Sequence, residues 1–218
     1  MNLRLASRLL ALAIAVMALA PSPASANFIY VESVNGDLSN DGLNPTLLVA
    51  GLGLNSITGT SVTPGPGATG RDFDYFTVTI PAGSLLDSIV LSNYFGANLT
   101  FFGMMAGTPF TVPPTDPPAT IPPRLLGWVH MTPDLIGSNL FPTMSSQTVP
   151  APVIGFTAPV PAGDYSFWIQ EAGTDPANYS LNFNVSAVPE LSTFALTNIV
   201  LILVAAGRRL QAGKFASR

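Results

Sequence analysis

The chain of 218 residues contains no cysteine and a single histidine, His130. The absence of cysteine excludes a disulfide framework, a cysteine-ligated zinc site and a cysteine nucleophile. One histidine is too few for the usual transition-metal site. No G-x-S-x-G motif occurs around any serine, and the pattern around His130 is typical of a strand. We therefore predict that the protein is not an enzyme.

Charge is also scarce, at 9% of residues against roughly 25% in average globular proteins. Between Asn27 and Ala187 only Arg71 and Arg124 are basic, whereas eleven residues are acidic. Both ends of the chain are basic instead. An acidic body repels phosphate backbones, so nucleic acid is disfavoured as a partner.

Proline and glycine are plentiful, at 21 and 19 residues, and they favour turns between short strands. No part of the body shows a helical period, and several segments alternate apolar and polar residues or form short apolar runs. This pattern predicts an all-β fold, a single jelly-roll-like β-sandwich over residues 27–187. The expected strands include residues 74–80, 88–92, 99–104, 125–131, 165–170 and 179–185.

The aromatic residues are expected to divide between the core and the surface. Alternation places Phe76, Val78 and Ile80 on one face of their strand. Trp128 is predicted to lie in the core, whereas Trp168 shares a face with Ser166 and Gln170. Exposed Trp or Tyr94 rings could stack on sugars, although such rings more often fill cores.

The segment PPTDPPATIPP, residues 113–123, has too many prolines to pair in a sheet. We predict a stiff, exposed loop of polyproline type there. The alternatives are a plain connection between strands or a docking site for a partner.

The first 26 residues have the order of a secretory signal peptide. Arg4 and Arg8 precede an apolar run, and Ala24-Ser25-Ala26 provides the small residues that signal peptidase requires. Cleavage between Ala26 and Asn27 would release the body outside the cytoplasm.

The last 31 residues, 188–218, combine an extended start, a short apolar helix and a basic tail. Phe194 to Ala206 would form about 20 Å of helix, which is short for a bilayer core of about 30 Å. Arg208 and Arg209 follow the helix, so the positive-inside tendency keeps the tail cytoplasmic.

These features resemble the PEP-CTERM sorting signal of Gram-negative bacteria, many of which produce exopolysaccharide. The matching residues are Val188, Pro189, Glu190, Ser192, Thr193, Arg208 and Arg209, while Leu191 replaces the family's second proline. The resemblance implies a transmembrane helix that holds the protein transiently in the inner membrane. It also implies cleavage near Pro189 by an exosortase, a membrane-embedded transpeptidase.

The body resembles bacterial pre-peptidase C-terminal-like domains, which are accessory β-sandwiches of secreted proteins. The motifs shared with them are Asp74-Tyr75-Phe76, Pro81-Ala82-Gly83, Gly163-Asp164-Tyr165 and the strand from Tyr179 to Phe183. Such domains are not usually catalysts.

Carboxylate and amide side chains gather in DLSNDGLN, residues 37–44. Asp37, Asn40, Asp41 and Asn44 are candidate oxygen ligands for Ca²⁺, and Asp72 or Asp74 could join them in space. The alternative is that these residues simply form turns.

Together, the patterns predict an exported, non-enzymatic protein of the cell surface or extracellular matrix. Its partners would be signal peptidase, an exosortase-like enzyme and, as an open alternative, exopolysaccharide. One alternative is a carbohydrate- or Ca²⁺-binding surface module, which an exposed Trp168 beside an acidic groove would favour. Another is a secreted hydrolase, which two carboxylates converging near His130 would favour.

Overall fold

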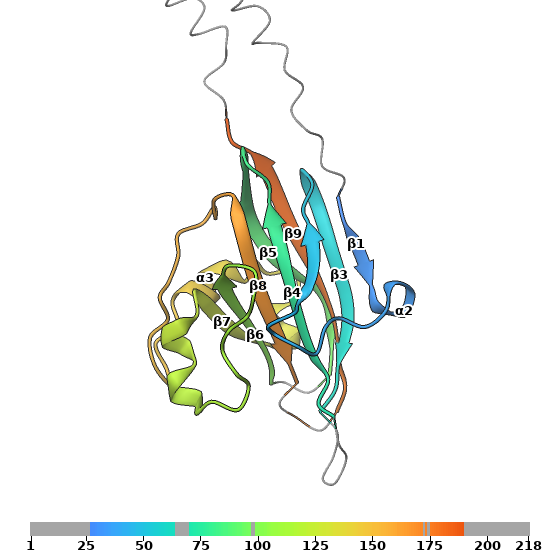
Figure 1. Cartoon of the computed structure of the whole chain (residues 1–218), viewed down its shortest axis with the longest axis vertical. Coiled ribbons are helices and arrows are strands. Elements are labelled where there is room, and N and C mark those ends of the chain that lie inside the picture. The colour runs from blue at the N-terminus through green and yellow to red at the C-terminus, as the bar shows by residue number, and fades with distance from the viewer. Residues whose placement is uncertain (1–26, 64–69, 97–98, 172, 174, 190–218) are drawn as a thin grey trace, which may run out of the picture. The chain divides into compact units, whose positions relative to one another are not determined.

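The computed structural model describes residues 27–63, 70–96, 99–171, 173 and 175–189. The predicted signal peptide and nearly all of the predicted sorting signal lie outside these residues. Nine strands form two mixed sheets in the described part, which bears out the predicted all-β sandwich (Figure 1). One compact unit, Ala24–Ala187, contains all of these strands.

The first sheet has the strand order β1-β3-β9-β5, and the second has the order β2-β4-β8-β6-β7. The edge strands β1 and β2 run parallel to their neighbours, and the other pairs are antiparallel. The strands are β1 (Ile29–Val31), β2 (Thr46–Val49), β3 (Gly53–Ser61), β4 (Phe73–Ile80), β5 (Ser84–Phe95), β6 (Thr100–Ala106), β7 (Gly127–Met131), β8 (Gly163–Gln170) and β9 (Ala177–Ala187).

Short helical turns lie between the strands. They are α2 (Glu32–Asn35), η1 (Pro118–Thr120), η2 (Pro122–Arg124), η3 (Pro133–Leu135) and α3 (Phe141–Ser145). Within the described residues, no helix is both long enough and apolar enough to cross a bilayer. The predicted membrane helix falls in the part that is not described.

The main core lies between the two sheets, and alternation predicts its contributors correctly. Phe76, Val78 and Ile80 of β4 are buried there, as are Phe167 of β8 and Phe183 of β9. Phe76, Phe167 and Phe183 contact one another through their rings. Their burial supplies the main apolar driving force that joins the sheets.

The outer face of the second sheet is also covered, which alternation alone does not predict. The connection between β6 and β7, residues 107–126, folds over this face, and we call it the lid. A second cluster of buried residues forms beneath it, consisting of Tyr75, Phe110, Val112, Leu125, Trp128 and Trp168. The lid also provides a hydrogen-bond partner for a polar side chain of that face, since Thr77 donates to the carbonyl of Thr108 at 2.5 Å.

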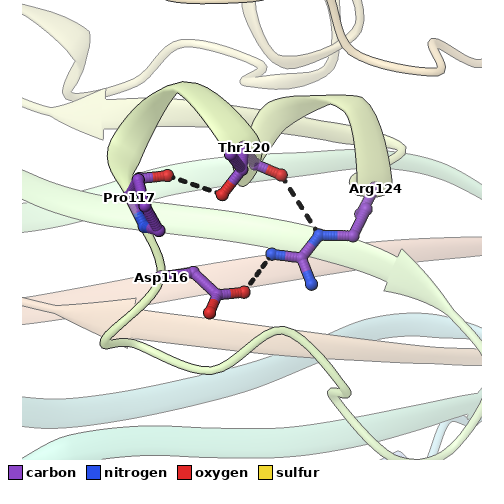
Figure 2. Close-up of polar contacts among 4 residues, drawn as sticks. All are labelled: Asp116, Pro117, Thr120 and Arg124. Atoms are coloured by element: carbon purple, nitrogen blue, oxygen red, sulfur yellow. Dashed lines mark hydrogen bonds and ion pairs between the residues drawn. The ribbon is translucent and has the colours of Figure 1, made fainter.

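The proline-rich segment is not paired in a sheet, as predicted, but it is not a polyproline helix. Prolines begin both η1 and η2, because a fixed φ suits the first position of a helical turn. Thr120 donates to the carbonyl of Pro117, and the Arg124 guanidinium donates to the carbonyl of Thr120 and to Asp116 (Figure 2). Pro122 is buried, so the segment is packed rather than fully exposed.

Candidate metal centre

The chain changes sheets between β1 and β2, and we call residues 32–45 the acidic crossover. It begins with the single turn of α2, where the amide of Gly36 donates to the carbonyl of Glu32 at 3.0 Å. Gly36 has φ of 96°, a conformation that glycine adopts without steric cost. This turn redirects the chain so that Asp37 comes back towards Glu32.

Glu32 is half-buried and is held by backbone donors from two directions. The amide of Thr60 on β3 donates to Oε2 at 2.7 Å, and the amide of Leu38 donates to Oε1 at 3.4 Å. Burial raises the pKa of Glu32 despite these two bonds. Gly59 allows this approach, because a Cβ there would lie 2.8 Å from Cδ of Glu32.

Asp74, on β4, is the most buried member of the site, with 0% of its surface exposed. The hydroxyl of Tyr179 on β9 donates to its Oδ2 at 2.8 Å. Its Oδ1 is buried and has no hydrogen-bond partner. Buried polar atoms in proteins nearly always have a partner, so this oxygen indicates a ligand or a proton.

Glu32, Asp37 and Asp74 converge, with one carboxylate oxygen from each lying within 4.8 Å of the others. Asp37 is exposed and gives the cluster an opening to solvent. Burial, followed by the charge of Glu32, raises the pKa of Asp74 to about 9. Burial and the charge of Asp37 raise the pKa of the neighbouring Asp72 to about 6.

No basic side chain neutralises this cluster within the residues that the structure describes. The salt bridge that the described residues form joins Arg124 to Asp116 in the lid. Three carboxylates at this separation repel one another, so the cluster must hold protons or a cation. The donors are all oxygen atoms, which suits a hard cation such as Ca²⁺ or Mg²⁺.

The predicted Ca²⁺ ligands separate into two groups. Asp37 joins the cluster, and so does Asp74, one of the two residues that were expected to join from a distance. Asp41 and Asn44 form a turn of their own, because Asp41 accepts from the amide of Leu43 at 2.9 Å and from the side chain of Asn44 at 2.6 Å. Asn40 accepts from the amide of Phe73 at 2.6 Å and so ties the crossover to β4.

Sequence reasoning did not include Glu32 among the candidate ligands. It lies five residues before Asp37, and a loop motif read along the chain does not extend to it. The useful signal was its scarcity, since Glu32 and Glu171 are the only glutamates between Asn27 and Ala187.

The other candidate residues lie away from this cluster. His130 lies on β7 and is partly exposed, and the partial burial of its ring lowers its pKa. Glu171 acts on His130 through its charge, but Glu171 is 0% exposed and accepts from Thr100. Trp168 is 3% exposed and does not form an open stacking platform.

Among the predicted sorting residues, the structure describes Val188 and Pro189, which are exposed directly after β9. Glu190, Ser192, Thr193, Arg208 and Arg209 lie outside the described residues, as do Ala24 and Ala26. No protein-family model, curated protein or solved structure matches the chain.

Proposed function

We propose that the protein is an exported, non-enzymatic β-sandwich of the cell surface or extracellular matrix, stabilised by one Ca²⁺ ion at the acidic crossover. The observation that supports the ion most strongly is Asp74, whose buried Oδ1 has no partner and whose neighbours are two more carboxylates. Ca²⁺ fits better than Mg²⁺, because it tolerates irregular sets of oxygen ligands and carbonyls.

The ion would join parts of the fold that are distant in sequence. Glu32 and Asp37 belong to the crossover, whereas Asp74 belongs to β4 of the second sheet and is bonded to Tyr179 of the first. A cation here therefore fixes the crossover and its two parallel edge strands against both sheets. The open side at Asp37 suggests the affinity of an extracellular module, with Kd of about 10⁻⁴–10⁻³ M.

The export proposal rests on the two ends of the sequence. The N-terminal signal helix would be removed after Ala26. The C-terminal transmembrane helix would hold the jelly-roll-like body at the inner membrane until an exosortase-like enzyme cuts near Pro189. Val188 and Pro189 are exposed directly after β9, so a protease could bind the chain there as an extended peptide.

Thermal unfolding of the full chain in detergent tests the Ca²⁺ site. A Kd of about 10⁻⁴–10⁻³ M lies about 10- to 100-fold below a free Ca²⁺ concentration of about 10 mM, so binding adds about 1.4–2.7 kcal/mol to the stability of the folded state. For a body of this size we expect Tm to rise by about 3–10 °C in about 10 mM Ca²⁺. A Tm that does not change with Ca²⁺ would sink the proposed site.

The intact mass of the protein recovered from its native host tests export and sorting. We expect a mature chain that begins at Asn27 and ends near Pro189. A chain that ends at Arg218 would contradict cleavage and would leave the C-terminal segment as a permanent anchor.

A further inference from the structure

A hollow of about 240 Å³ lies under the lid, on the outer face of the second sheet. Its floor includes Phe101, Trp128 and Trp168 from the neighbouring strands β6, β7 and β8. Prolines of the lid form part of the other side, and the hollow is partly open to solvent. Ligand sites in proteins have this mainly apolar lining with a few polar groups, although those for drug-sized molecules are larger, at about 300–1,000 Å³.

Both tryptophans that line this hollow also carry an unused hydrogen-bond donor, which is covered in this structure. The indole Nε1 atoms of Trp128 and Trp168 are buried and have no hydrogen-bond partner. A buried indole N–H usually finds an acceptor, and two of them at one hollow call for an explanation. Neither donor has a protein acceptor, so a ligand whose acceptor oxygens reach them after a shift of the lid would satisfy both.

The remaining polar groups of the lining indicate the ligand's chemistry. Asp116, His130 and Gln170 line the hollow, and they offer acceptors as well as donors. Asp116 is already paired with Arg124, so the site has no surplus charge of either sign to bind an ion (Figure 2). The ligand should therefore be neutral and should carry hydroxyl groups that both donate and accept.

We propose that this hollow binds a neutral sugar unit, whose hydroxyls pair with the two indole N–H groups and with Gln170. The C–H faces of the ring would lie against Phe101 and the prolines. A proline-rich peptide would also bring carbonyl acceptors, but it has few donors for Asp116 and His130. The indole nitrogens have no accessible surface in this structure, so the proposed binding includes an outward shift of the lid that uncovers them.

Tryptophan fluorescence gives a direct test, because Trp128 and Trp168 are the only tryptophans of the chain. The full chain, in a detergent without a sugar headgroup, is titrated with glucose, galactose, mannose, xylose and their 1,4-linked disaccharides. We expect a saturable spectral shift with at least one of them, in calcium-free buffer as well as in Ca²⁺. This proposal does not depend on the cation site.

Two variants locate the binding. Gln170→Ala keeps both tryptophans, and Trp168→Phe keeps a ring while it removes one N–H; each should weaken binding by about tenfold or more, which corresponds to about 1.4 kcal/mol. Asn182→Ala, on β9 of the other sheet, is the matched control and should bind as the wild type does. Circular dichroism establishes that each variant is folded.

Three results would overturn the proposal. The first is that no sugar of the panel shifts the fluorescence. The second is that Gln170→Ala, folded, binds the responding sugar as tightly as the wild type. The third is that the peptide PPTDPPATIPP saturates the same signal while sugars do not, which would make the hollow a peptide groove.

Discussion

The two buried carboxylates, Glu171 and Asp74, are both 0% exposed, but their surroundings differ. Glu171 accepts from Thr100 through Oε2 and from the amide of Gly173 through Oε1, at 2.5 Å for the amide. Asp74 accepts from Tyr179 through Oδ2 only. Its Oδ1 is buried and has no hydrogen-bond partner.

This difference separates a structural carboxylate from a candidate ligand. Each oxygen of Glu171 has a neutral donor, so this side chain can remain buried as part of the scaffold. Asp74 has other carboxylates as neighbours instead of donors, so its burial is costly unless a proton or a cation arrives. Burial by itself does not identify a functional acid, whereas burial together with an unsatisfied oxygen does.

The largest expected effect is that of Asp74→Asn on the response to Ca²⁺. The amide has nearly the same shape but no charge, and we expect the rise of Tm with Ca²⁺ to disappear. In calcium-free buffer at pH 8 this variant should melt at or above the wild-type temperature, because no carboxyl group must be kept protonated. A Ca²⁺-dependent rise of wild-type size in Asp74→Asn would contradict the assignment.

Glu171→Gln should give the opposite pattern. One of its two donors would then face an amide NH₂ group, and the buried unpaired group should cost about 1–3 kcal/mol of stability. Denaturant unfolding measures this loss, and we expect it with and without Ca²⁺. The increment from Ca²⁺ should equal that of the wild type, and its loss would show that the two acids are not independent.

The pH dependence of stability sharpens the comparison further. Folded Asp74 keeps its proton up to a pKa of about 9, whereas the unfolded chain releases it near 3.8. Between these values the folded state holds more protons, so the cation-free protein should lose stability as pH rises from about 4 towards 9. The raised pKa values of Glu32 and Asp72 act in the same direction.

Melting curves at pH 5, 6.5 and 8 in calcium-free and Ca²⁺ buffers measure this effect. Ca²⁺ replaces the protons, so its stabilisation should be larger at pH 8 than at pH 5. A calcium-free Tm that is constant or rises over this range would be inconsistent with a buried, protonated Asp74.

The smallest effect is expected for Asp41→Asn. Asp41 is exposed, and the bonds from the Asn44 side chain and then from the Leu43 amide lower its pKa within a local turn. Its replacement should leave the Ca²⁺ midpoint unchanged and alter stability by less than about 0.5 kcal/mol. A large loss of Ca²⁺ affinity in Asp41→Asn would show that the ion binds in the loop of residues 37–44 instead.

The sequence predicted the sandwich because period-two alternation is a local property. It identified the inward face of β4 and the presence of β8 and β9 correctly, but it missed β1, β2 and β3. The first two are short edge strands, and β3 (GLNSITGTS) is mostly small and polar. Burial of Tyr75 and Trp168 depends on the lid, a distant segment that local alternation cannot report.

The candidate site could be predicted only in part, for the same reason. Asp37 and Asp74 were expected as oxygen donors, but their separation and burial depend on how the crossover returns to β4. Glu32 reaches the cluster through its bond with Thr60 on β3, a contact between residues 28 positions apart. Such long-range contacts determine which acids of a loop become ligands and which form its turns.

Isothermal titration of Ca²⁺ into the calcium-free full chain and into Asp74→Asn tests the central claim most directly. We predict one ion per chain with Kd of about 10⁻⁴–10⁻³ M for the wild type and no saturable binding for the variant. Equal binding by both proteins, or no binding by the wild type, would contradict a calcium site at Glu32, Asp37 and Asp74.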